Sequence, residues 1–329
     1  MRTGSKRNWF EHFDEALCKL PLRFIYGLSG GVDSVALLHK LVGAGYKPVV
    51  CHFNHRWRSQ ADSDAKFCNE LAKKYQLDFF IGCASDAELE TKEEVARRAR
   101  LSFFERVSRA IGIYDVVLAH HADDVVETYL LQLFRGGNSA AFGIKSPARW
   151  GDLTIWRPWL SVWRSEIKAY AEKEQLKWVE DCTNKNTQFH RNWIRHELLP
   201  LLEKQFHNRI REAIWRRAMV SAARAEWISD LVHDESATDK LSVHALRAWP
   251  VGKQREVIYY WLRHKKVSDI DYDDVENIRL LAVQEKPARI NLSQCQQAYR
   301  KNGWIQIRSL PGTSKVGSLS RIDSQDVKG

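Results

Sequence analysis

Strand-like and helical segments alternate between residues 24 and 134 of this 329-residue chain. Short apolar runs, typical of buried strands, lie at residues 24–28, 48–53, 79–81 and 115–119. Helical spacing of apolar residues follows each run, at residues 34–42, 61–75, 93–111 and 124–134. Parallel strands need long crossover connections, usually helices, so this order predicts an α/β fold with a doubly wound parallel sheet.

Three polar segments follow predicted strands directly, and they carry most of the candidate chemistry. They are Ser29–Ser34, His52–Arg58 and His120–Asp124. In an open α/β sheet, ligands bind beyond the carboxyl ends of the strands. We therefore expect the three segments to meet at one edge of the sheet and to form a binding site there.

The segment GLSGGVDS, from Gly27, fits two well-known motifs only in part. It contains G-x-S-x-G, the nucleophile elbow of an esterase, but the 28 residues before Ser29 leave no room for the strands that supply an oxyanion loop. It also resembles a Walker A loop, but the lysine that such a loop extends to the terminal phosphates is missing. The sequence favours neither an esterase nor a Walker-type ATPase.

What remains is a glycine-rich turn at a helix N-terminus, which is a phosphate-binding device. Two glycines expose backbone N–H groups and two serines add hydroxyl donors; a loop without lysine suits a pyrophosphate that leaves as one unit. Asp33 would repel phosphate unless Mg²⁺ lay between them, which favours metal-bridged ATP. The predicted ATP- and pyrophosphate-binding residues are Ser29, Gly30, Gly31, Val32, Asp33 and Ser34.

The hexapeptide Ser29–Ser34 matches the SGGxDS motif of the PP-loop ATP pyrophosphatases, and other segments resemble the tRNA(Ile)-lysidine synthetase family within that superfamily. The segment from His120, HHADDVVETYLLQLFRGG, is similar to HHxDDQxET…RG of that family. EEVARRARLSFF, RPWL and HFNHRWR are similar to its ExxARxxRYxxF, RPLL and HxxHxLR segments. The most discriminating segment, EDCTNKNTQFHRNWIRHELLPLL, resembles EDxTN…RNxxRxxxxPLL, because generic PP-loop enzymes lack the RNxxR element.

The resemblance extends over about residues 22–210 and, more weakly, over 240–308. Three positions depart from it: Val125 stands where Gln is usual, Leu101 where Tyr is common, and Trp57 where Leu is usual. These departures concern secondary contacts and leave the loop and the carboxylates intact. Acceptor-stem contacts that longer members make with an additional C-terminal domain are expected to be absent or replaced.

The resemblance implies a PP-loop (adenine nucleotide α-hydrolase-like) sheet and a two-step ligation. ATP adenylates the C2 carbonyl oxygen of the wobble cytidine in an isoleucine tRNA with a CAU anticodon, and the ε-amine of free L-lysine then displaces AMP to give lysidine. The cofactors implied are ATP and Mg²⁺, and the partners are this tRNA and lysine. Such a reaction needs a pyrophosphate cradle, charge neutralisation and acidic groups that hold an ammonium.

Carried onto this chain, the resemblance gives two further groups of candidate residues. Those for catalysis, Mg²⁺ or lysine binding are Asp33, His120, His121, Asp123, Asp124 and Glu127, with Mg²⁺ placed on Asp33 and Asp124. Those for phosphate or tRNA contacts are Arg97, Arg100, Arg135, Arg191, Asn192 and Arg195. Plainer alternatives stay open: the acids favour a helix N-terminus, the arginines a solvated helix face, and the histidines a structural role.

Composition narrows the class of protein further. Lys and Arg exceed Asp and Glu to give a net charge of +10, which favours a polyanionic partner such as tRNA. The six cysteines form no C-x-x-C pair, which argues against the main rival, a 2-thiocytidine-type modifier. No secretory signal or membrane-length apolar run is visible, so we expect a cytoplasmic protein without a membrane partner. A non-catalytic tRNA-binding protein with a degenerate ATP site is the second alternative, and the oligomeric state, monomer or homodimer, stays open.

The chain is predicted to divide into four parts. Residues 1–204 form the PP-loop catalytic domain, and 205–232 a basic linker helix. Residues 233–310 form a small, mainly helical domain for tRNA or substrate binding, with short strands at 289–292 and 304–307. The tail 311–329, rich in Ser, Gly and Lys, is predicted to be disordered.

Overall fold

The structure, a computed structural model, describes residues 17–56, 60–84, 93–136, 143–180, 190–206, 209–267, 270–284, 288–292 and 296–310. Its contacts define two compact units, Met1–Arg135 with Ala141–Ala223, and Gly136–Ala140 with Arg224–Gly329. The boundary at Ala223 falls inside one long helix, and the predicted boundaries at 204 and 232 stay predictions. The predicted tail lies outside the described residues.

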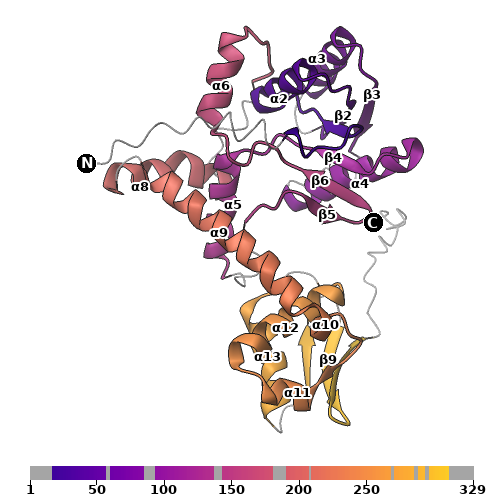
Figure 1. Ribbon diagram of the computed structural model, residues 1–329, viewed down its shortest axis with the longest axis vertical. Coiled ribbons are helices and arrows are strands. Elements are labelled where there is room, and N and C mark those ends of the chain that lie inside the picture. Colours follow the sequence, from indigo (N-terminus) through magenta and orange to yellow (C-terminus); the bar gives the residue numbers. More distant parts are fainter. Residues whose placement is uncertain are drawn as a thin grey trace, which may run out of the picture. The chain divides into compact units, whose positions relative to one another are not determined.

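The first unit is built on a six-stranded sheet in the order β3-β2-β1-β4-β6-β5 (Figure 1). All neighbours are parallel except β5 and β6, which are antiparallel. The strands are β1 (Ile25–Gly27), β2 (Val49–Asn54), β3 (Phe79–Cys83), β4 (Asp115–Val117), β5 (Ala148–Trp150) and β6 (Leu153–Trp156). The four strands predicted between residues 24 and 119 are confirmed, β6 coincides with a further strand-like run of the sequence at 153–157, and the edge strand β5 is an addition.

Helices cover both faces of this sheet, which confirms the doubly wound prediction. The helices of the alternating part are α2 (Val32–Gly43), α3 (Ala61–Lys74), α4 (Glu93–Ile111), α5 (Ala122–Phe134) and α6 (Arg164–Lys173). The chain continues through α7 (His190–Trp193), the π-helical segment η4 (Ile194–Leu198), α8 (Leu199–Phe206) and α9 (Ile210–Leu231). Figure 1 shows α2, α3 and α6 on one side of the sheet and α4 on the other.

Alternate side chains of the strands enter two separate cores. In β1, Tyr26 packs with α2 and α6, whereas Ile25 packs with α4. In β2, Val50 and Cys51 divide in the same way. Because successive strand residues point to opposite faces, short runs that are apolar throughout are what a sheet covered on both sides requires. Each fully buried side chain of this size contributes about 1.5–3 kcal/mol.

Three helices begin shortly after three neighbouring strands, so their first turns lie at the carboxyl ends of those strands. Helix α2 follows β1, α5 follows β4 and α6 follows β6. Their first turns carry Asp33, the pair Asp123 and Asp124, and Arg164 with Glu166. Acids are favoured there by the helix dipole and by N–H groups that have no partner inside the helix.

The second unit has a four-stranded antiparallel sheet, in the order β7-β10-β9-β8, together with helices. The strands are β7 (Leu241–Ser242), β8 (Arg289–Leu292), β9 (Gln296–Lys301) and β10 (Trp304–Ser309). The helices are α10 (His233–Ser236), α11 (Val243–Ala248), α12 (Val251–His264) and α13 (Tyr272–Val283). Two of these strands were predicted, while β7 and β9 were not, so this unit is more evenly mixed than expected. Among the described residues of the whole chain, no helix is long and apolar enough to cross a membrane.

Candidate active site

The glycine-rich loop after β1 is organised by one hydroxyl group. Ser34 Oγ accepts the backbone N–H groups of Ser29 and Gly30, both at 3.2 Å, and donates to the carbonyl of Gly31 at 3.0 Å. Gly30 has φ +88°, and a Cβ there would lie 3.2 Å from Cys68 Sγ. The turn thus needs glycine at this position and is fixed before any ligand arrives.

The loop leaves the start of α2 open to an anion. The N-cap residue, Gly31, supplies no side-chain acceptor. The first-turn N–H groups of Val32, Asp33 and Ser34 therefore have no partner inside the helix and are available to an anion. The Ser29 hydroxyl lies 3.0 Å from the Ser34 hydroxyl and contacts no base in the described part of the chain. This supports a hydrogen-bonding role for Ser29 over that of an activated nucleophile.

Beside the loop, three carboxylates surround one buried imidazole, and we call these four residues the acidic cluster. His121 Nε2 lies 3.8 Å from Asp33 and 3.5 Å from Asp124, and its Nδ1 lies 3.6 Å from Asp123. Burial disfavours the charged ring, but the three acids prevail and raise the pKa of His121 to about 9. At neutral pH the cluster therefore has three acids around an imidazolium.

The three acids of the cluster differ in their electrostatic environments. Burial raises the pKa of Asp33, despite its cationic neighbours. Burial acts in the same direction on Asp123 and Asp124, but His121 and backbone N–H donors outweigh it and lower their pKa values. The predicted meeting of Ser29–Ser34 with His120–Asp124 is thus present in the structure.

The acidic cluster fits a metal that is held mainly by its substrate. Asp33 Oδ1 is buried without a hydrogen-bond partner, which leaves one carboxylate oxygen available. Within the described ranges, no group of three or more His, Cys, Asp or Glu is arranged to hold a metal by itself. Mg²⁺ commonly takes one or two carboxylates and completes its shell with phosphate oxygens and water. The residues present suit Mg²⁺ bound together with a nucleotide.

Glu127, on the next turn of α5, is committed to an arginine. Its two oxygens accept Arg195 Nε at 2.7 Å and Arg195 Nη2 at 3.0 Å, and Arg191 Nε lies 3.6 Å away. Arg191 also donates to Thr128 at 2.9 Å. The π-helical segment η4 begins between these arginines; such segments are frequent at functional sites. Burial raises the pKa of Glu127 against the effect of Arg195.

A second group of side chains concentrates positive charge near the ends of β2, β4 and β6, and we call it the basic cluster. It consists of Arg97, Arg100, Arg157, His55 and His120. Arg157 Nε lies 3.2 Å from His120 Nδ1. Burial and then Arg157 lower the pKa of His120 to about 3, and burial followed by Arg97 and Arg100 lowers that of Arg157 to about 10. Cations that depress one another in this way create a potential that attracts anions.

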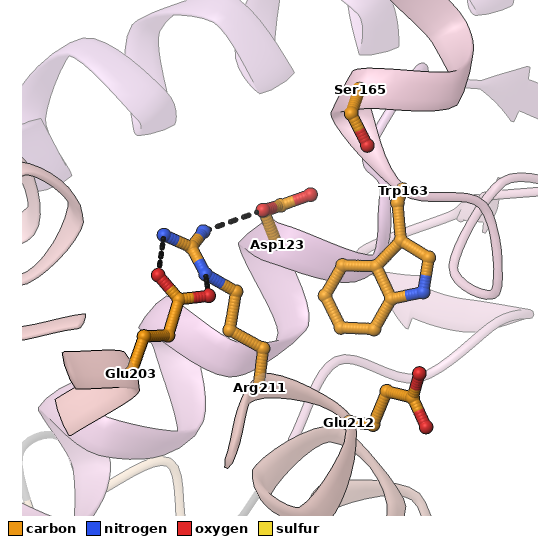
Figure 2. A pocket seen from close by; sticks show the side chains of 6 residues that line it. All are labelled: Asp123, Trp163, Ser165, Glu203, Arg211 and Glu212. Atoms are coloured by element: carbon orange, nitrogen blue, oxygen red, sulfur yellow. Dashed lines mark hydrogen bonds and ion pairs between the residues drawn. The ribbon is translucent and has the colours of Figure 1, made fainter. Parts of the chain in front are cut away.

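A pocket of about 450 Å³ opens beside the acidic cluster and shares Asp123 with it (Figure 2). It is lined by Asp123, Trp163, Ser165, Glu203, Arg211 and Glu212. Arg211 bridges Glu203, at 2.6 and 3.2 Å, and Asp123, at 3.0 Å. Figure 2 shows the Trp163 ring facing this bridge and Glu212 below the ring. The lining has three carboxylates, one guanidinium and one large apolar ring, so it suits a cation with an apolar stem.

The remaining predicted residues lie outside these groups or are only partly characterised. Arg135 follows the last turn of α5, about 18 Å from Asp123 at 1.5 Å per residue, so the structure does not bring it to the acidic cluster. Asn192 is half-buried in α7 beside Arg191. Val125 and Leu101 are buried in apolar cores, so the departures from the family pattern there are accommodated by packing. Trp57 lies outside the described residues.

Sequence reasoning missed three residues that the structure places at the site. Arg164 lies 3.6 Å from Asp33, and Arg157 and Arg211 contact His120 and Asp123. A signal was present for Arg164, which opens a third helix after a third strand. Arg211 had none, because its contact joins positions 88 residues apart in the sequence.

The chain matches the family ATP_bind_3, described as a PP-loop domain, over residues 5–202. This is more than half of the chain and includes the glycine-rich loop, the acidic cluster and the basic cluster. A PP-loop ATP-binding domain implies the use of ATP.

The relatives and one solved structure agree with this match. The chain is 30% identical over 247 residues to a tRNA(Ile)-lysidine synthase of Actinobacillus pleuropneumoniae serotype 3 (strain JL03), covering 73% of this chain but only 58% of that relative. It is 32% identical to the tRNA(Ile)-lysidine synthase of Thermosynechococcus vestitus, covering 80% of this chain and 79% of that one. The fold resembles that of the U34-tRNA thiolase NcsA from Methanococcus maripaludis, with a TM-score of 0.54 at 15% identity over 66% of this chain and 81% of that chain. With its PP-loop domain and relatives of this identity and coverage, the chain belongs to the tRNA(Ile)-lysidine synthase family of PP-loop proteins.

Proposed function

We propose that the protein ligates free lysine to C2 of the wobble cytidine of a CAU-anticodon isoleucine tRNA, using ATP and releasing AMP and pyrophosphate. One observation carries the proposal: the pre-organised loop Ser29–Ser34 meets the acidic cluster at one edge of the sheet. An anion cradle beside cation-binding acids is what an adenylation followed by an amine attack requires. The names of the family's relatives supply the identity of the tRNA and the amine.

In the first step, the C2 carbonyl oxygen attacks the α-phosphorus of ATP and pyrophosphate leaves. The N–H groups at the start of α2 and the Ser29 hydroxyl bind the phosphates in this scheme. Asp33 and Asp124 would hold Mg²⁺, which supplies neutralisation of phosphate charge. The positive charge of the His121 imidazolium offsets part of the negative charge of these acids, which lets them lie close together.

In the second step, the lysine amine attacks C2 and AMP leaves with the electron pair of the C2–O bond. The ammonium form, with a reference pKa of about 10.4, must first lose a proton. His121 is unsuited to receive it because its ring already carries one, and His120 is unsuited because its low pKa, about 3, makes its ring a weak base. We therefore assign a carboxylate of the acidic cluster as the acceptor.

The pocket beside Asp123 is the place that we assign to free lysine. Its three carboxylates outnumber the single guanidinium of Arg211, and the Trp163 ring offers an apolar surface for the methylene chain. Asp123 connects the pocket to the acidic cluster, so an amine held there is close to the adenylation site. Glu127 is a weaker candidate than its position in the sequence indicated, since it is fully buried, does not line this pocket and has both oxygens engaged by Arg195.

The basic cluster is the part of this unit that we assign to tRNA. Arg97 is exposed on α4, and Arg100 and Arg157 lie deeper around His120. Phosphate contacts of this kind bind RNA with a strong dependence on salt concentration. We further propose that residues 233–310 form the second tRNA-binding domain, and we expect the protein to act in the cytoplasm.

Release of pyrophosphate and AMP by the whole chain tests the proposal. Pyrophosphate is expected to form with ATP, Mg²⁺ and the tRNA, and AMP to be released when lysine is added. Ser29→Ala and Asp33→Ala are expected to abolish turnover and to leave tRNA binding largely intact. Loss of tRNA binding with retained ATP binding would contradict our assignment of the loop, and AMP release that requires a sulfur donor would contradict the reaction.

A further inference from the structure

The PP loop has no lysine, yet a pyrophosphate that leaves with the bonding electron pair needs a nearby cation. Arg164 lies where such a cation is needed. It is the first residue of α6, and its backbone N–H donates to Asp123 Oδ2 at 2.9 Å. Its Nε lies 3.6 Å from Asp33 Oδ2, in the first turn of α2. The guanidinium therefore lies next to the loop and on the side of the acidic cluster.

The side chain of Arg164 also differs from its neighbours in having donors to spare. Arg195 and Arg211 each make short hydrogen bonds to both oxygens of a glutamate. Among the described residues, the Arg164 side chain donates no hydrogen bond, and its ion pair with Asp33 is longer than a hydrogen bond. Its side chain is 38% exposed, so a ligand that binds at the loop can reach it.

We propose that Arg164 binds the β- and γ-phosphates of ATP and stabilises pyrophosphate as it leaves. The inference rests on the proposed function. When the carbonyl oxygen bonds to the α-phosphorus, the bond from that phosphorus to the bridging oxygen breaks, and its electron pair goes to pyrophosphate. A guanidinium matches two phosphate oxygens at once, which a lysine ammonium does not. The loose contact with Asp33 is one that a polyphosphate readily replaces.

Binding of pyrophosphate and of AMP to the whole protein separates this role from a structural one. Calorimetric titration of Arg164→Gln with Mg²⁺-pyrophosphate is expected to show affinity reduced by roughly tenfold or more, the loss of one charge-assisted contact. Affinity for AMP is expected to stay within about twofold, because AMP has no β-phosphate. Arg164→Lys should regain part of the pyrophosphate affinity. In turnover, Arg164→Gln should lower kcat/KM for ATP by about a hundredfold.

The control is Arg109→Gln, which removes an exposed arginine paired with Glu105 in the same unit and should change neither affinity. Equal pyrophosphate affinity in Arg164→Gln and the wild type would overturn the proposal, as would an equal loss of AMP and pyrophosphate binding. If the wild type itself bound pyrophosphate only in a way that ATP does not displace, the proposed function would fail instead.

Discussion

Replacing Glu127 by alanine is expected to destabilise the first unit substantially, because it leaves Arg195 without its main partner inside the protein. Glu127 is fully buried, with 0% of its side chain exposed, and both its oxygens accept hydrogen bonds from Arg195, whose side chain is 17% exposed. The nearest remaining acid is Asp124, 3.7 Å from Arg195 Nη2. The pair connects α5, which carries the acidic cluster, to η4.

The expected size follows from this burial. Breaking a buried ion pair by removing one partner costs about 3–5 kcal/mol. Arg195 keeps some solvent and the weak attraction of Asp124, so we expect the lower end, about 3 kcal/mol. For a unit of this size, that loss lowers the melting temperature by about 6–12 °C. The exposed pair of Glu105 and Arg109 is the matched control, and Glu105→Ala should cost less than about 1 kcal/mol.

Urea unfolding measures the loss of stability directly. It is applied to Glu127→Ala, to Glu127→Leu and Arg195→Met as single variants, and to the double variant that combines the last two. Replacing both partners by apolar side chains removes the unpaired charge, so the double variant should recover most of the lost stability. The reasoning is refuted if Glu127→Ala unfolds within 1 kcal/mol of the wild type, or if the two single losses simply add in the double variant. Either result would return Glu127 to the candidates for binding lysine.

Three further predictions follow from the loop and the basic cluster. Burial and neighbouring cations hold the pKa of His55 at about 4 and of His120 at about 3, below the unfolded value of about 6.5. The unfolded chain thus binds more protons between pH 6.5 and 4. The free energy of unfolding measured with urea should therefore decrease as the pH is lowered through this window, by at most about 1.4 kcal/mol per pH unit for each histidine. Gly30→Ala, which forces φ +88° on a residue with a Cβ 3.2 Å from Cys68 Sγ, should abolish ATP binding measured by calorimetry, whereas Gly45→Ala, whose Cβ meets nothing, should retain it. Arg97→Gln should weaken tRNA binding and reduce its salt slope by about one; an unchanged slope would exclude Arg97 from the phosphate contacts.

The sheet of the first unit could be predicted because its signals are local. Each buried strand is a short apolar run, and each is followed by helical spacing in the next segment. The topological rule for parallel sheets then brings the strand ends together, which is why Asp33 and His121, 88 positions apart, could be placed in one site. The edge strand β5 has no such run, since it is half exposed and pairs only with β6.

The second unit was harder because its strands are partly exposed and carry no continuous apolar run. One signal was present and missed: Asn302-Gly303 joins β9 and β10 with φ values of +50° and +74°. An Asn-Gly pair with both φ angles positive is the signature of a two-residue hairpin turn. Leu241–Ser242 had no local signal, since this strand exists only through its pairing with Trp304 and Ile305.

The roles of single arginines could not be predicted from the sequence, because they depend on which acid each one meets. Arg191 and Arg195 stand out in the motif, but Glu127 occupies the guanidinium of Arg195. Arg164 carries no motif of its own and keeps an open guanidinium beside Asp33. Such differences arise from tertiary contacts that no local pattern records.

Mass spectrometry of the wobble nucleotide shows directly whether the protein forms lysidine. A CAU-anticodon isoleucine tRNA transcript is incubated with the protein, ATP, Mg²⁺ and lysine, then digested to nucleosides. We expect the wobble cytidine to gain the mass of lysine less one water, and this gain to be lost with Asp33→Ala. An unmodified cytidine under conditions in which the protein binds both ATP and this tRNA would contradict it.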